Sequence, residues 1–165
     1  MKLIAEKRSS NDKYDVLRFV RNNGSATDAL MPRQGILPHD LIHYVVESAL
    51  PLRHGFLSQV ALGADAQLLE QAGHGAGNPA AHQQAAQVEA IVEGLQTQLW
   101  CGSFNLDAFL AAANSACAAR GHRPFDLSGI DVHATLYQRA QALHAQWQEI
   151  PFNHALSLDF SPRVV

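Results

Sequence analysis

The stretch KLIAEKRSSNDKYDVLRFVR, residues 2–21, decides the fold class, because it reads as two strands joined by a turn. The turn-rich residues 9–12 separate segments 2–7 and 14–21, which carry β-branched and aromatic side chains such as Ile4, Val16 and Phe19. Such residues favour strands, and two strands around a short polar turn predict a β-hairpin. Residues 22–25 form a second turn, and 26–31 predict a third strand that Pro32 ends by removing a backbone donor.

The remainder of the chain predicts helices followed by one more strand. Segment 156–160 alternates apolar and polar residues, as a half-buried strand does, and should pair with the N-terminal sheet. Between the strands, caps, glycines and helical periodicity predict helical segments at 38–50, 55–62, 65–72, 79–100, 106–120 and 132–148, with a surface loop at 73–79. The expected fold is α+β: a single domain over residues 1–165, with a small, mainly antiparallel sheet covered on one face by about five helices.

Composition excludes several classes of protein. The chain is 47% hydrophobic and 16% charged, with a net charge of −3, which indicates a folded globule. No apolar run approaches the ~20 residues that span a bilayer, and the charged N-terminus is unlike a signal peptide, so a cytoplasmic location is expected. Cys101 and Cys117 lie in apolar helical surroundings and predict free, buried thiols, while Trp100 and Trp147 predict core aromatics.

The basic residues of the N-terminal third could contact nucleic acid from the hairpin, but a solvated hairpin edge is the favoured interpretation. They lack interleaved aromatic residues, and charged side chains on sheet edges commonly block aggregation. They are Lys7, Arg8, Lys13, Arg18 and Arg21. No partner can be read from the sequence, and the chain should fold as a monomer or as a small oligomer such as a homodimer.

The candidate site lies on the predicted helix 38–50. His39 and His43 are four residues apart, so their imidazoles project from consecutive turns and can converge on one cation. Asp40 and Glu47 lie on the same side, while Leu41, Ile42, Val45 and Val46 form the opposite, apolar side. The pattern predicts a site for zinc or another divalent metal.

The segment His39-Asp40-Leu41-Ile42-His43 resembles the His-Glu-x-x-His helix of the zincin metallohydrolases, over five residues. The resemblance implies that His39 and His43 are metal ligands and that Asp40 takes the place of the glutamate general base. Two departures stand out. Aspartate is one methylene shorter than glutamate, and the longer metzincin motif is absent, because Val46 and Ala49 replace its glycine and third histidine.

A third ligand must come from elsewhere in the chain. His54 follows the helix after Pro51, and a chain reversal could return it toward His43. Glu47 is too far along the helix to share the ion with His39, and is expected instead to hold a ligand in place. Glu89 and Glu93 could face the histidines, although a solvated helix face is the simpler interpretation.

The sequence thus supports two main functions, with nucleic-acid binding through the basic hairpin as a third and weaker hypothesis. One is a small metal-dependent hydrolase or metal-binding protein centred on His39 and His43. The alternative is a non-enzymatic interaction or adaptor protein without a metal site, in which Asp40 only complements the helix dipole and the histidines belong to an ordinary polar surface.

Overall fold

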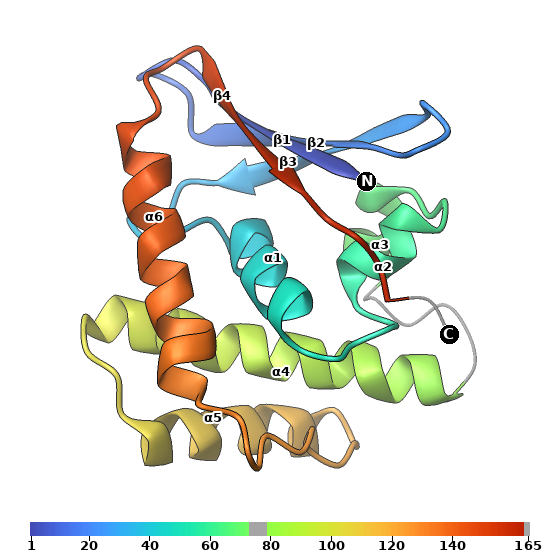
Figure 1. Cartoon of the computed structure of the whole chain (residues 1–165), viewed down its shortest axis with the longest axis vertical. Helices are drawn as coiled ribbons and strands as arrows, with labels where there is room; N and C mark the ends of the chain where they lie inside the picture. Colours follow the sequence, from blue (N-terminus) through green and yellow to red (C-terminus); the bar gives the residue numbers. More distant parts are fainter. Residues whose placement is uncertain (73–78, 164–165) are drawn as a thin grey trace.

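The computed structural model describes residues 1–72 and 79–163. It has a four-stranded antiparallel sheet in the order β3-β2-β1-β4, with the helices packed against one face (Figure 1). The expected α+β class is confirmed. Within the described residues the helical layer contains six α-helices and one π-helical segment, which together occupy the six predicted helical segments. The predicted loop at 73–79 lies almost wholly outside the described residues.

The sheet joins the two ends of the chain. Its strands are β1 (Lys2–Lys7), β2 (Tyr14–Val20), β3 (Ala26–Pro32) and β4 (His154–Asp159). The C-terminal strand joins the N-terminal sheet, as expected, and its partner is β1. Ile4 lies opposite Ser157 on β4 and opposite Arg18 on β2. Pro32 ends β3 at the sheet edge, where its missing N–H costs no ladder hydrogen bond.

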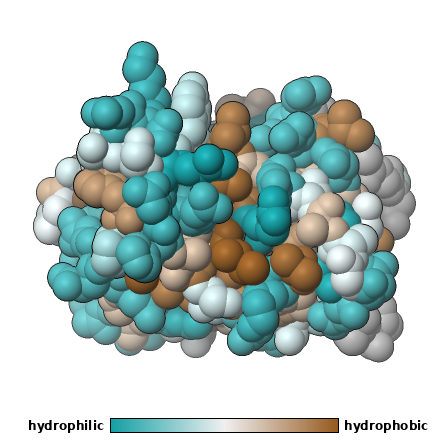
Figure 2. All heavy atoms as spheres, turned by 90° about the horizontal axis from the view of Figure 1, so that it is seen from above, coloured by the Kyte–Doolittle hydropathy of each residue, from teal (hydrophilic) through white to brown (hydrophobic). Residues whose placement is uncertain are grey.

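Period-2 alternation gives the sheet one buried and one outer face. The inner side chains include Leu3, Leu17 and Phe19, all with no exposed surface. On the outer face Ile4 and Val16 are half-buried and Leu30 is 54% exposed. Figure 2, which looks down on this face, shows a hydrophobic strip bordered by hydrophilic side chains.

The helices begin and end close to their predicted bounds. They are α1 (His39–Ala49), α2 (Phe56–Ala61), α3 (Ala66–Ala72), α4 (Pro79–Cys101), α5 (Leu106–Ala119) and α6 (Arg139–Glu149), with the π-helical segment η1 (His133–Gln138) leading into α6. Asn105 caps α5 by accepting from the Ala108 N–H, and Asp131 accepts from the Ala134 N–H before η1. Among the described residues, no helix has the length and hydropathy to cross a membrane.

Helix α1 occupies the centre of the molecule, between the sheet and α4 (Figure 1). Its apolar side, formed by Leu41, Ile42, Val45 and Val46, is buried in the core. Pro38 stands just before the helix, and its carbonyl accepts from the N–H groups of Leu41 and Ile42. A helix buried on nearly every side leaves no solvated face, so its polar residues must find partners within the protein.

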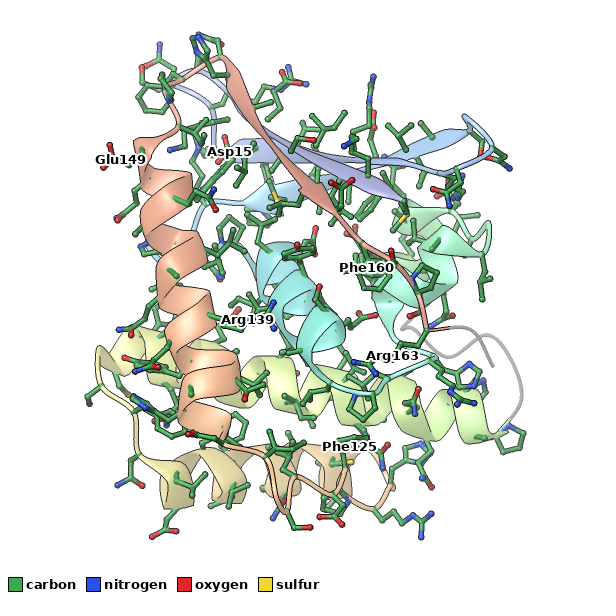
Figure 3. All side chains as sticks on the ribbon, viewed as in Figure 1. Asp15, Phe125, Arg139, Glu149, Phe160 and Arg163 are labelled. Atoms are coloured by element: carbon green, nitrogen blue, oxygen red, sulfur yellow. The ribbon has the colours of Figure 1, made fainter. Side chains whose placement is uncertain are left out.

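The far end of α6 approaches the sheet near a buried ion pair. Figure 3 shows Asp15 and Glu149 at this end of the molecule. Elsewhere in the same view, Phe160 is turned toward the interior beneath β4. Asp15 is only 2% exposed and accepts from the Arg33 guanidinium, at 2.8 Å from Nη2 to Oδ1. The hydrogen bond to Asp15 raises the pKa of Arg33 further above its usual value.

Two predictions about single side chains are wrong. Cys117 is buried, but Cys101 is exposed at the end of α4. Trp147 belongs to the core, whereas Trp100 is 55% exposed, with its indole N–H donating to the Gln34 carbonyl. Both errors arise at the last turn of α4, where Trp100 and Cys101 are exposed.

Candidate metal centre

Helix α1 places two imidazoles next to each other on the side that faces α4. His39 is the first residue of the helix and His43 follows one turn later, with the ring centroids 5.0 Å apart. The His43 side chain is 1% exposed, and that of His39 is 34% exposed. Phe56 of α2 covers the inner side of His43, at 5.5 Å between ring centroids. The pair therefore has a dry inner end and an accessible outer end.

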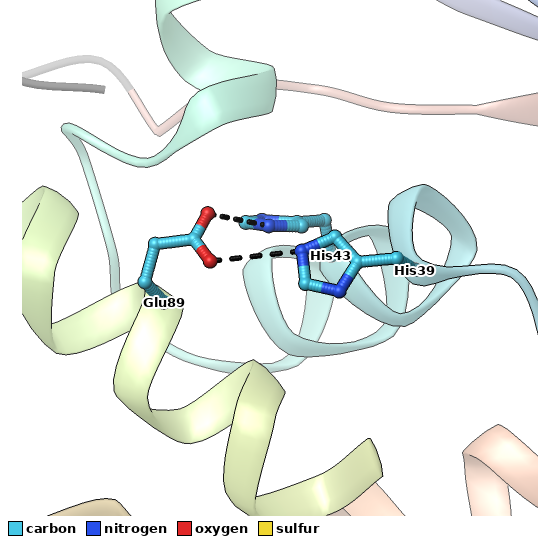
Figure 4. Close-up of side chains that lie close together, drawn as sticks. All are labelled: His39, His43 and Glu89. Carbon is cyan, nitrogen blue, oxygen red and sulfur yellow. Dashed lines mark ion pairs between the residues drawn. The ribbon is translucent and has the colours of Figure 1, made fainter. Parts of the chain in front are cut away.

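Helix α4 supplies a carboxylate opposite both rings. Glu89 Oε1 lies 2.9 Å from His43 Nε2, and Glu89 Oε2 lies 3.6 Å from His39 Nε2 (Figure 4). Each of the three residues offers a ligand atom, and these atoms all lie within 4.8 Å of one another. The three residues, His39, His43 and Glu89, are called the triad below.

The opposite nitrogen of each imidazole is held by an acceptor. Gln96 Oε1 lies 3.1 Å from His39 Nδ1 and also accepts from Gln34 Nε2, which identifies that atom as the amide oxygen. Glu47 Oε1 lies 3.1 Å from His43 Nδ1. Because each of these oxygens accepts a hydrogen bond, each ring carries a proton on Nδ1. The other ring nitrogen, Nε2, is then the one that can bind a metal, and in both rings it faces Glu89.

The triad carries a strongly perturbed imidazole. Burial alone would lower the pKa of His43, but the carboxylates of Glu89 and Glu47 outweigh burial and raise this pKa from 6.5 to about 10. In the metal-free protein His43 is therefore an imidazolium between two carboxylates at neutral pH. Perturbed groups of this kind gather at functional sites and also in structural ion pairs.

The other residues predicted for the site lie at different places. Glu47 is fully buried beyond His43 and accepts from the backbone N–H groups of Leu57 and Ser58. Asp40 is buried in the first turn of α1 and is not part of the triad. His54 also lies outside the triad: its backbone N–H donates to Gln84 Oε1 on α4, and Glu89 takes the third position that the sequence suggested for His54.

The sequence gives too little weight to Glu89 and does not identify Gln96, the residue that supports His39. A solvated face is the simpler interpretation of Glu89 in the sequence, yet the residue points at α1. Gln96 follows Glu89 by two helical turns, so the spacing alone places it on the same face of α4. That spacing is a usable signal, but which element α4 faces cannot be read from it.

Two imidazole nitrogens and one carboxylate oxygen, supplied by two packed helices, form a set that can hold a divalent metal and leave a position for water. His133 lies in a different cluster, in which its ring stacks on Tyr137 at 5.7 Å between ring centroids.

In comparisons with known proteins, no family model, no curated protein and no solved structure matches this chain.

Proposed function

We propose that this protein binds a divalent metal ion between α1 and α4, through His39 Nε2, His43 Nε2 and the Glu89 carboxylate. The supporting observation is the spacing of the triad. Ligands at 2.0–2.1 Å from a tetrahedral ion lie about 3.3 Å from one another. Glu89 places one carboxylate oxygen 2.9 Å from His43 Nε2 and the other 3.6 Å from His39 Nε2, and one ligand atom from each residue of the triad lies within 4.8 Å of the other two. An ion would enter by drawing these ligand atoms toward that spacing.

Charge balance also favours a dication. Glu47 and Glu89 place two carboxylates in a largely buried region, with side-chain exposures of 0 and 13%. A divalent ion that displaces the proton of His43 would add positive charge beside these carboxylates, and a buried charge is costly unless it is paired.

Zinc is the metal that this ligand set favours most. Imidazole nitrogen suits zinc, copper, iron and nickel, whereas magnesium and calcium prefer all-oxygen sites. Two histidines with one glutamate form the ligand set of several catalytic zinc sites, in which the fourth position holds water.

The reaction that we propose is metal-assisted hydrolysis. A metal ion with three protein ligands can lower the pKa of its bound water to about 7 and so supply hydroxide at neutral pH. By its position after His39, and by the resemblance to the zincin helix, Asp40 is the proposed general base. The exposed side of His39 gives a substrate access to the open coordination position.

Metal binding is tested with untagged protein, because a histidine tag binds the same ions. Stripped protein is titrated with Zn²⁺ or Co²⁺ by calorimetry, and one ion per chain is expected. His43→Ala and Glu89→Gln should each weaken binding at least tenfold. His54→Ala and Glu93→Gln serve as controls: neither residue belongs to the triad, and Glu93 pairs with Arg120. Tight binding that survives Glu89→Gln, or no binding by the unmodified chain, would refute the proposed site.

Hydrolysis is tested with a panel of activated esters, phosphoesters and peptides, assayed with and without a chelator. Activity should require the metal, and Asp40→Asn should lower kcat while leaving metal affinity within about twofold. Metal binding without any chelator-sensitive turnover would overturn the hydrolase assignment and leave the metal site standing.

A further inference from the structure

Glu47 is held in place by a small, specific set of contacts. Its Oε1 lies 3.1 Å from His43 Nδ1 and 3.1 Å from the Leu57 backbone N, and its Oε2 lies 3.3 Å from the Ser58 backbone N. The side chain has no exposed surface. A buried carboxylate with three N–H donors is fixed in both position and orientation.

Gly55 creates the space that this carboxylate occupies. A Cβ atom at this position would lie 2.2 Å from Glu47 Oε2 and 2.3 Å from its Cδ, well inside any real contact distance. The backbone of Gly55 has φ −74° and ψ 175°, a conformation open to every residue. Glycine is therefore needed at position 55 to leave room for the Glu47 carboxylate, and not to give the turn its backbone conformation.

The two imidazoles of the triad differ in their supporting acceptor. His43 faces a carboxylate, while His39 faces the neutral amide of Gln96. A carboxylate behind an imidazole fixes the ring and raises its basicity as a metal ligand, more than an amide does. His43 is also the ring that lies closer to Glu89 and is shielded from solvent.

We infer that Glu47, positioned by Gly55 and by the Leu57 and Ser58 amides, is the residue that makes His43 the dominant imidazole ligand of the site. This inference rests on the proposed function, because it concerns the ion that the triad would bind. Glu47 acts through His43 and does not contact the ion. His39 is then the weaker ligand, on the open side of the site.

The first test is a double-mutant cycle in Co²⁺ or Zn²⁺ affinity. Gly55→Ala and Glu47→Ala should each weaken binding about 10–100-fold, the usual effect of removing such a supporting group. The double variant should bind no more weakly than Glu47→Ala, because the shortened side chain leaves room for the new Cβ atom. Gln96→Leu is the matched change behind His39 and should cost less. Additive losses in the cycle, or a larger loss for Gln96→Leu, would overturn the inference.

The second test measures the contact between Glu47 and His43 in the metal-free protein. In ¹⁵N-edited NMR of the stripped protein, the His43 Nδ1–H should exchange slowly and resonate downfield, as expected for a buried proton shared with a carboxylate. Glu47→Gln and Gly55→Ala should move or broaden that resonance and leave the signals of His39 unchanged. Glu47→Gln keeps the size of the side chain, so it remains informative if Gly55→Ala fails to fold.

The two tests separate this inference from the proposed function. No metal binding by the unmodified chain would refute the proposed function and, with it, the metal role of Glu47. If the chain binds metal but the His43 resonance is unaffected by both variants, only the role of Glu47 is overturned.

Discussion

Replacing Glu89 by glutamine should change how the stability of the metal-free protein depends on pH. The pKa of His43 is raised from 6.5 to about 10 in the folded state, where burial opposes and the carboxylates of Glu89 and Glu47 favour the charged ring. Because the folded state holds this proton more tightly, the stabilisation is fully present below pH 6.5. It is lost as the pH rises through about 10.

The size of the effect follows from the shift. The rise in the pKa of His43 from 6.5 to about 10 corresponds to about 5 kcal/mol of folding stability at most. The free energy of unfolding should fall by up to ~1.4 kcal/mol per pH unit between roughly pH 7 and 9. Glu89 exerts the largest charge effect that raises this pKa, with Glu47 supplying much of the rest. Glu89→Gln should therefore cost about 2–3 kcal/mol at pH 7 and much less at pH 10.

The assay is urea unfolding in the presence of a chelator, repeated from pH 6 to pH 10. The free energies of unfolding of the unmodified protein and of Glu89→Gln should converge at high pH. Glu93→Gln, one turn away on α4, carries the same change outside the contact with His43 and should not alter the pH dependence. A constant difference between Glu89→Gln and the unmodified protein at every pH would show that only packing was lost, and would refute the charge argument.

Three further predictions concern the core and the ion. Phe56→Ala, which removes the ring in edge-on contact with Phe19 and beside His43, should destabilise the protein by about 3–5 kcal/mol in denaturant unfolding; a loss below about 1 kcal/mol would contradict this packing. Asp15→Ala should cost about 1–3 kcal/mol by leaving the Arg33 guanidinium without its main acceptor, and the same unfolding assay checks it. Zn²⁺ at about one hundred times its Kd should stabilise the protein by ~2.7 kcal/mol, seen as a rise in Tm, and should stabilise His43→Ala by no more than about half as much; an equal rise in both proteins would point to binding elsewhere.

Much of the fold could be predicted because turn residues divide the chain clearly. The polar turns around the N-terminal strands, the cap at Asn105 and the prolines at 32 and 79 all mark element ends within a residue or two. The alternation in the last strand is enough to place it in the sheet. The π-helical start of η1 could not be foreseen, because no composition or spacing distinguishes it from an ordinary helical turn.

Only part of the site could be predicted, because spacing along the sequence does not show which helices pack together. His39 and His43 lie on one helix, so local spacing determines that their side chains are neighbours. Glu89 comes from a different helix, and its approach depends on how α1 and α4 pack, which is a long-range property. The same holds for Gly55, whose role depends entirely on the carboxylate that folds against it.

The separation of His43 and Glu89 along the chain gives the proposed ion a second role, as a reversible crosslink. A bond between the two residues would close a loop of roughly 45 residues, and restricting a loop of that size in the unfolded chain is worth about 4 kcal/mol in the chain-entropy model for a covalent link. The helices α2 and α3 lie within that loop. Chelation should therefore lower the free energy of global unfolding, seen as faster exchange of the amides in the central strands that open only when the whole protein unfolds.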